Sequence, residues 1–91
     1  MRPDDINSIL HNIPRLQWAC RRGMLELDVL LGNFLQEAYP NLSFEDKKQF
    51  VILLEQADPE LFAWLLGSDA PQEDGLLRMT EAIRQHARSR L

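Results

Sequence analysis

Apolar residues recur with helical spacing along most of this chain. The clearest stretch lies before Pro40, where they follow the i, i+3, i+4, i+7 pattern of one helical face. The members of this stripe are Leu27, Leu30, Leu31, Phe34, Leu35 and Ala38. Glu26, Asn33 and Glu37 fall on the other face. Pro40 is expected to end the helix, because proline lacks an amide donor and restricts the residue before it.

Residue types at helix ends predict a helix before this one and another after it. Residues 14–22 form the first expected helix, with Pro14 near its start and Gly23 just past its end. Ser43 is expected to cap a helix over residues 44–56, and the acidic Glu45 and Asp46 suit its first turn. The apolar positions of that helix are Phe50, Val51, Leu53, Leu54 and Ala57.

Two more helices are expected in the last third of the chain. A short one is capped by Asp58, has Pro59 at its first position and ends before Gly67. Its expected inner stripe is Leu61, Phe62, Leu65 and Leu66. Residues 68–75 read as a loop, and the final helix starts near Asp74. Its expected apolar positions are Leu76, Met79, Ile83 and Ala87.

The pattern therefore predicts an all-α protein, a small single-domain five-helix bundle over residues 13–91. Residues 1–12 are expected to be a flexible N-terminal extension. Neither the alternating pattern of strands nor an internal repeat is found in the sequence. Its apolar runs are too short to span a membrane, and its N-terminus does not resemble a secretory signal, so we expect no membrane insertion.

Charge is spread unevenly over the 91 residues, whose net charge is −4. Residues 43–75 hold two Lys and eight Asp or Glu, whereas residues 76–91 hold four Arg and one Glu. The acidic middle argues against nucleic acid as a partner, since nucleic-acid binding needs a basic face. The single cysteine, Cys20, cannot form an internal disulfide, so the chain fits a reducing compartment, and we expect it to be cytoplasmic.

Catalytic and metal-binding patterns are not found in this sequence. His11 and His86 are far apart and do not form a metal-ligand spacing with Cys20, so we expect neither a metal site nor an enzyme. Cys20 is interpreted as a small buried hydrophobe. Trp64 is expected in the core, and Gly32 is expected where another helix approaches closely.

Opposite charges are concentrated around one glycine in the segment WACRRGMLELD, residues 18–28. Two interpretations remain open. In the first it is only a turn, with Gly23 left-handed, Arg21 and Arg22 at one helix end, and Glu26 and Asp28 at the next helix start. In the second, the density of charge beside Trp18 marks a protein-docking surface, since Trp and Arg are typical interface anchors.

This segment resembles the signature R-G-x-x-E of the bacterial FAD assembly factors of succinate dehydrogenase. The match comprises Arg22, Gly23 and Glu26 with Met24 and Leu25 between them. The stretch DPELFAWLLG and the expected helix start at Ser43 are also similar to that family, and the resemblance covers about residues 14–67. It implies a small five-helix bundle without catalytic residues, in agreement with the pattern above.

The resemblance also implies a function and a site. Members of that family bind the flavoprotein subunit of succinate dehydrogenase, and in bacteria often that of fumarate reductase. They promote covalent attachment of FAD to a histidine of that subunit, so the cofactor belongs to the partner. The implied contacts are Arg22, Gly23 and Glu26, with Arg21, Asp28 and Trp18 as flanking candidates.

Two rival interpretations remain. The chain could be an antitoxin-like regulatory protein of a toxin–antitoxin pair, which would need a toxin as partner. It could also be a small FAD-binding protein, which the lack of a dinucleotide-binding motif disfavours.

Overall fold

The computed structural model describes residues 3–90, with side chains described from Ile6 onward. Over these residues the chain forms six α-helices and one short 3-10 helix, without any strand. They are α1 (Pro3–His11), α2 (Ile13–Ala19), α3 (Leu25–Glu37), η1 (Tyr39–Asn41), α4 (Phe44–Leu54), α5 (Asp58–Leu65) and α6 (Asp74–Ser89). The all-α prediction is confirmed, and the five expected helices correspond to α2 to α6.

The additional helix α1 occupies the segment that we expected to be a flexible extension. Its last turn contacts the body of the protein, because Leu10 is buried and its carbonyl oxygen accepts a 2.6 Å hydrogen bond from the Tyr39 hydroxyl. Asn12 then caps α2 by accepting a 3.3 Å bond from the Arg15 amide. The flexibility of residues 1–12 stays a prediction, since it concerns motion.

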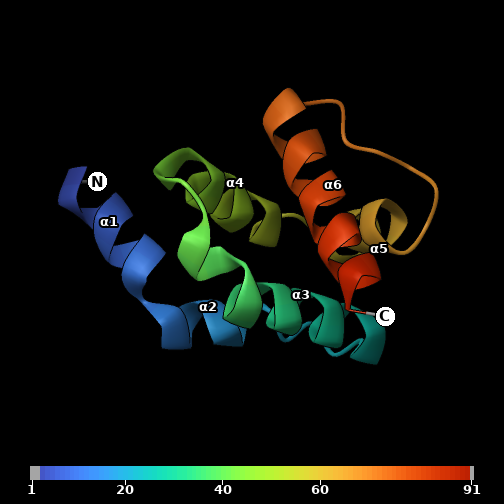
Figure 1. Cartoon of the computed structure of the whole chain (residues 1–91), viewed down its shortest axis with the longest axis horizontal. Helices are drawn as coiled ribbons and strands as arrows, with labels where there is room; N and C mark the ends of the chain where they lie inside the picture. Colours follow the sequence, from blue (N-terminus) through green and yellow to red (C-terminus); the bar gives the residue numbers. More distant parts are fainter. Residues whose placement is uncertain (1–2, 91) are drawn as a thin grey trace.

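The core is built from the apolar stripe of α3 and the faces of α4, α5 and α6 that meet it. Figure 1 shows α6 running alongside α4 and α5, with its C-terminal end lying over α3. Phe34 of α3 stacks on Phe50 of α4 at a ring distance of 5.5 Å. The buried side chains include Leu27, Leu31, Leu35, Leu53, Leu61, Leu65, Leu76, Met79 and Ile83.

Several details of the helix ends differ from the sequence-based expectation. The Ser43 cap is confirmed, since its hydroxyl accepts a 3.1 Å bond from the Asp46 amide. Asp58, however, is the first residue of α5 and not its cap, and the cap position belongs to Ala57. Phe62 and Leu66 were expected on the inner stripe but are exposed. The side chains that α5 buries are those of Leu61 and Leu65.

Four core predictions can also be compared with the structure. Trp64 packs against the core as expected, and Cys20 is buried. The expectation for Gly32 was wrong, because a methyl group built there meets nothing within 4 Å. Ala57 is exposed and not part of the core.

Candidate functional site

The segment between α2 and α3, residues 20–24, forms a sharp elbow. The last turn of α2 closes at Cys20, whose amide donates to the Leu16 and Gln17 carbonyls. Gly23 then adopts φ +80°, in the left-handed region that favours glycine. A Cβ at Gly23 would meet nothing within 4 Å, so the backbone conformation, and not crowding, requires glycine here. Gly23 is left-handed as the sequence predicted, but it does not end the helix. The helix expected over residues 14–22 ends at Ala19, so Arg21 and Arg22 lie in the elbow and not in a last helical turn.

Arg22 points into the protein from this elbow, whereas the docking interpretation requires its side chain on the surface. Its Nε donates to Asp58 Oδ1 at 2.7 Å. Its terminal nitrogens donate to three backbone carbonyls at 2.8–3.0 Å, those of Ala19, Leu54 and Gln56. The side chain is 16% exposed. Arg22 thus joins the α2–α3 elbow to the junction between α4 and α5.

Asp28 also stabilises the elbow from within the same chain. Its carboxylate accepts a 2.6 Å hydrogen bond from the backbone amide of Arg22, and the side chain is half-buried. Because Asp28 lies in the first turn of α3, its charge also complements the helix dipole. Both Arg22 and Asp28 therefore set the geometry of the elbow. The place of Asp28 in the first turn of α3 is as the first interpretation predicted, whereas its bond to the Arg22 amide was not predicted.

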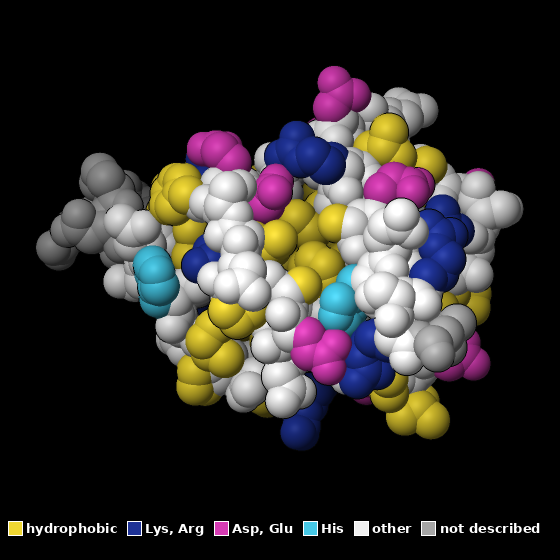
Figure 2. Space-filling model, in the orientation of Figure 1, with side chains coloured by type: hydrophobic (Ala, Val, Ile, Leu, Met, Phe, Trp, Pro, Cys, Tyr) yellow, Lys and Arg dark blue, Asp and Glu magenta, His cyan; other side chains and the backbone are white. Residues whose placement is uncertain are grey.

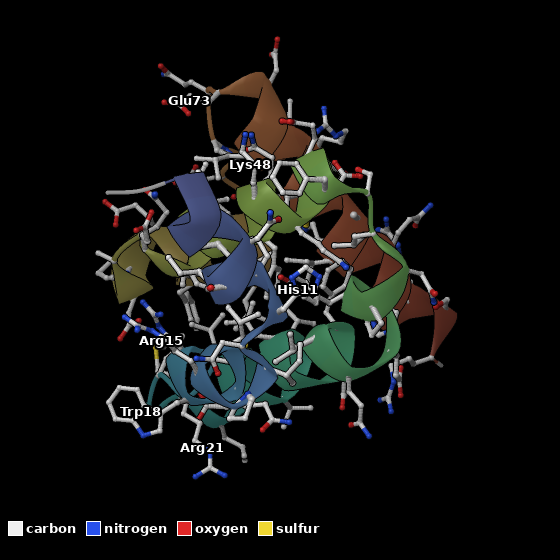
Figure 3. The ribbon with its side chains drawn as sticks, turned by 90° about the vertical axis from the view of Figure 1, so that its left-hand side faces the viewer. His11, Arg15, Trp18, Arg21, Lys48 and Glu73 are labelled. Carbon is white, nitrogen blue, oxygen red and sulfur yellow. The ribbon has the colours of Figure 1, made fainter. Side chains whose placement is uncertain are left out.

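The remaining candidate residues face solvent together with two apolar residues that the sequence analysis did not single out. Trp18 is 79% exposed and Leu25 is 78% exposed, while Val29 is 51% exposed. We name the elbow surface by its five outward members: Trp18, Arg21, Leu25, Glu26 and Val29. In Figure 3, Trp18 and Arg21 both project away from the body on the same side. Exposed large apolar side chains beside charged ones are typical of protein-binding sites.

A signal for the two missed residues was present in the sequence. Leu25 and Val29 do not belong to the buried stripe of α3, so an apolar side chain at either position must face away from the core. They also line grooves beside α3. One groove lies against α6 and includes Leu25 and Glu26, while the other lies against α2 and includes Arg21. Val29 lines both, so the elbow surface is continuous with both grooves.

Cys20 lies behind the elbow surface and is unsuited to nucleophilic chemistry. Burial raises the pKa of its thiol to about 12, although the neighbouring Arg22 charge opposes part of this rise. A thiol with such a pKa stays protonated at neutral pH, and the thiolate is the reactive form. The interpretation of Cys20 as a buried small hydrophobe is confirmed.

Metal ligands and membrane-spanning helices are two further features that would bear on function. Among the side chains of residues 6–90, His, Cys, Asp and Glu do not gather in groups of three or more that suit a metal ion. Within residues 3–90, every helix is too short or too polar to cross a bilayer.

Comparison with known proteins gives consistent matches. The family model described as the flavinator of succinate dehydrogenase matches residues 14–87. The protein named FAD assembly factor SdhE from Shewanella oneidensis is 53% identical over 78 residues, which cover 86% of this chain and 95% of that protein. Its namesake from Serratia sp. is 42% identical over 89% of this chain and 92% of that protein. The protein of the same name from Vibrio cholerae is 44% identical over 85% of this chain and 90% of that protein.

Proposed function

The chain belongs to the family of flavinators of succinate dehydrogenase, and we propose that it binds the flavoprotein subunit of that enzyme and promotes covalent attachment of FAD. The observation that carries this proposal is the elbow surface, which pairs exposed Trp18, Leu25 and Val29 with the charged Arg21 and Glu26. The flavoprotein subunit of fumarate reductase is proposed as a second client. The toxin–antitoxin interpretation has no support in these observations.

The proposed mechanism needs no catalytic group in this chain. Attachment requires a histidine of the flavoprotein to be held against the flavin ring, and correct positioning alone can supply several orders of magnitude in rate. A protein that binds the reactive conformation of its client more tightly than other conformations raises the population of that conformation. We therefore propose that the chain acts as a conformational chaperone and that the FAD remains with the client.

The candidate residues divide into two proposed roles. Trp18, Arg21 and Glu26 contact the client directly, with Glu26 forming a charge-assisted hydrogen bond across the interface. Gly23 leaves room for the client's backbone to approach, since the space beside it is open. Arg22 is a positioning residue, because its hydrogen-bonding groups are used within the chain.

Asp28 shares the positioning role with Arg22. It holds the Arg22 amide and so fixes the direction in which Gly23 and Glu26 are presented. This assignment replaces the expectation that Arg22 and Asp28 contact the client themselves. It predicts that a variant of either residue acts first on stability and only through it on the client.

The experiment measures covalent flavin on the flavoprotein subunit by fluorescence after denaturing electrophoresis, in cells without the chain and in cells that carry variants of it. Loss of covalent flavin without the chain and with Glu26→Ala is expected. Glu81→Ala, an exposed carboxylate of α6 outside the elbow surface, serves as the matched control and should restore flavinylation. Unchanged covalent flavin without the chain would refute the proposed function. Full restoration by Glu26→Ala would remove Glu26 from the contact.

A further inference from the structure

A groove of about 410 Å³ lies between α3 and the C-terminal end of α6, next to the elbow surface. Its lining residues from α3 are Leu25, Glu26, Val29, Leu30 and Asn33, and those from α6 are His86, Ala87 and Arg90. Three members of the elbow surface therefore form one wall of this groove. A partner that covers Leu25, Glu26 and Val29 therefore also covers the mouth of the groove.

The wall that α3 provides is largely apolar. Leu25 and Val29 stand on it as exposed side chains, and Leu30 lies deeper and is half-buried. Glu26 is the charged residue of this wall and Asn33 the neutral polar one. Covering this wall with an apolar side chain would remove exposed hydrocarbon from water, which is the main source of affinity in protein interfaces.

The wall that α6 provides carries Arg90 and His86, and both contact the Glu37 carboxylate. Arg90 donates from Nε and one terminal nitrogen to the two carboxylate oxygens of Glu37, at 2.8 and 3.1 Å. His86 Nε2 lies 3.0 Å from Glu37 Oε1, and its ring meets Phe34 edge-on at 5.5 Å. These contacts fix Arg90 beside the groove instead of leaving it free in solvent. Figure 2 shows basic, acidic and histidine side chains gathered where the end of α6 lies over α3.

The guanidinium of Arg90 is accessible to a second carboxylate as well as to Glu37. Arg90 donates to Glu37 from Nε and one terminal nitrogen, and Glu26 on the opposite wall is the acidic residue that lines the groove. Arg90 is exposed, so a second carboxylate can approach its guanidinium from the groove side. An arginine fork binds two carboxylates more readily than a lysine does, because its five donors point in fixed directions.

We propose that this groove receives an apolar side chain of the flavoprotein subunit, carried next to an acidic residue that pairs with Arg90. The proposal rests on the proposed function and extends its contact area from the elbow to α6. It assigns a role to the basic C-terminal helix, which the sequence analysis left without one. The apolar side chain gives affinity, and the carboxylate fixes the orientation of the client on the elbow.

The test measures the dissociation constant between the purified chain and the purified flavoprotein subunit of succinate dehydrogenase without covalent FAD. Ala87→Trp fills the groove from α6, and Glu81→Trp adds the same ring elsewhere on that helix as the matched control. Ala87→Trp should weaken binding by about tenfold or more, as expected when an interface anchor is displaced, and Glu81→Trp should stay within about twofold. Equal binding by wild type and Ala87→Trp would overturn the proposal.

A second pair of variants tests the charge without filling the groove. Arg90→Glu reverses the proposed contact, while Arg78→Glu reverses an arginine near the other end of α6 that also pairs with a carboxylate, that of Asp46. Arg90→Glu should bind the subunit more weakly than wild type at low salt, and this difference in affinity should shrink as the salt concentration rises. Arg78→Glu should bind as tightly as wild type. Equal effects of the two variants on affinity would contradict the proposed contact between Arg90 and an acidic residue of the client. Failure of the wild type to bind the subunit at all would instead refute the proposed function.

Discussion

Replacement of Arg22 by alanine should destabilise the protein far more than the same replacement of its neighbour Arg21. The Arg22 guanidinium makes four hydrogen bonds of 2.7–3.0 Å, one of them to a carboxylate, and is 16% exposed. Arg21 is exposed and has no ionic partner among the side chains described from residue 6 to 90. The two positions therefore provide a matched pair within one dipeptide.

The magnitude follows from the bonds that are lost and from what can replace them. A hydrogen bond to a charged group contributes about 1.5–3 kcal/mol, but four bonds of one side chain are not additive. Asp58 is partly exposed and can be rehydrated after the arginine is removed, which lowers the cost below that of a fully buried pair. We expect Arg22→Ala to lower the free energy of unfolding by about 3 kcal/mol and Arg21→Ala by less than about 0.5 kcal/mol.

The assay is urea denaturation of the isolated chain, followed by circular dichroism, with thermal melting as a second measurement. For a chain of this size, about 3 kcal/mol corresponds to a fall in Tm of more than about 10 °C. Arg22→Lys should fall between wild type and Arg22→Ala, because an ammonium group cannot reach all four acceptors at once. The reasoning is refuted if Arg22→Ala is as stable as Arg21→Ala. If such a stable variant also failed to restore flavinylation, Arg22 would contact the client directly.

Three further predictions concern single residues of the fold. Gly23→Ala should lower the free energy of unfolding by about 1–2 kcal/mol, because Gly23 is left-handed and open to solvent; no loss in urea denaturation would mean that the elbow relaxes. Thr80→Val should leave stability unchanged or raise it by up to about 1 kcal/mol, since the buried Thr80 hydroxyl has no partner within residues 6–90; a clear loss would reveal one. The folded state keeps the Cys20 proton up to a pKa of about 12, whereas an unperturbed thiol releases it near 9.0. Stability should therefore fall as pH rises from 9 to 12, by about 1.4 kcal/mol per pH unit for this group, and Cys20→Ala should flatten that slope in alkaline denaturation.

The local parts of the fold were accessible from the sequence, because the residues that determine them are near neighbours. The stripe of α3, the Ser43 cap and the left-handed Gly23 depend on residues within a few positions of one another. The helix α1 was not predicted, although Ile6, Ile9 and Leu10 have helical spacing. The first residues of a domain are often poorly ordered, and the expectation followed this tendency instead of the spacing.

The orientation of Arg22 was not accessible in this way. Its acceptors Leu54 and Gln56 lie 32 and 34 positions further along, and they are backbone carbonyls that no side-chain pattern marks. Asp58 was interpreted as a helix cap, the commonest use of an aspartate before a proline, so its pairing with Arg22 was not anticipated. The elbow surface could be predicted only as a charged segment, since its apolar half depends on which face α3 buries.

The contacts of Arg22 have a consequence for how the cell can use this protein. One guanidinium contacts the last carbonyls of α2 and α4 and the first residue of α5, so these three helices must be correctly placed before the elbow takes its shape. A partly folded copy of the protein therefore lacks the shape of the elbow as well as the overall fold. On the proposed role of the elbow surface, recognition of the client therefore depends on the integrity of the whole molecule.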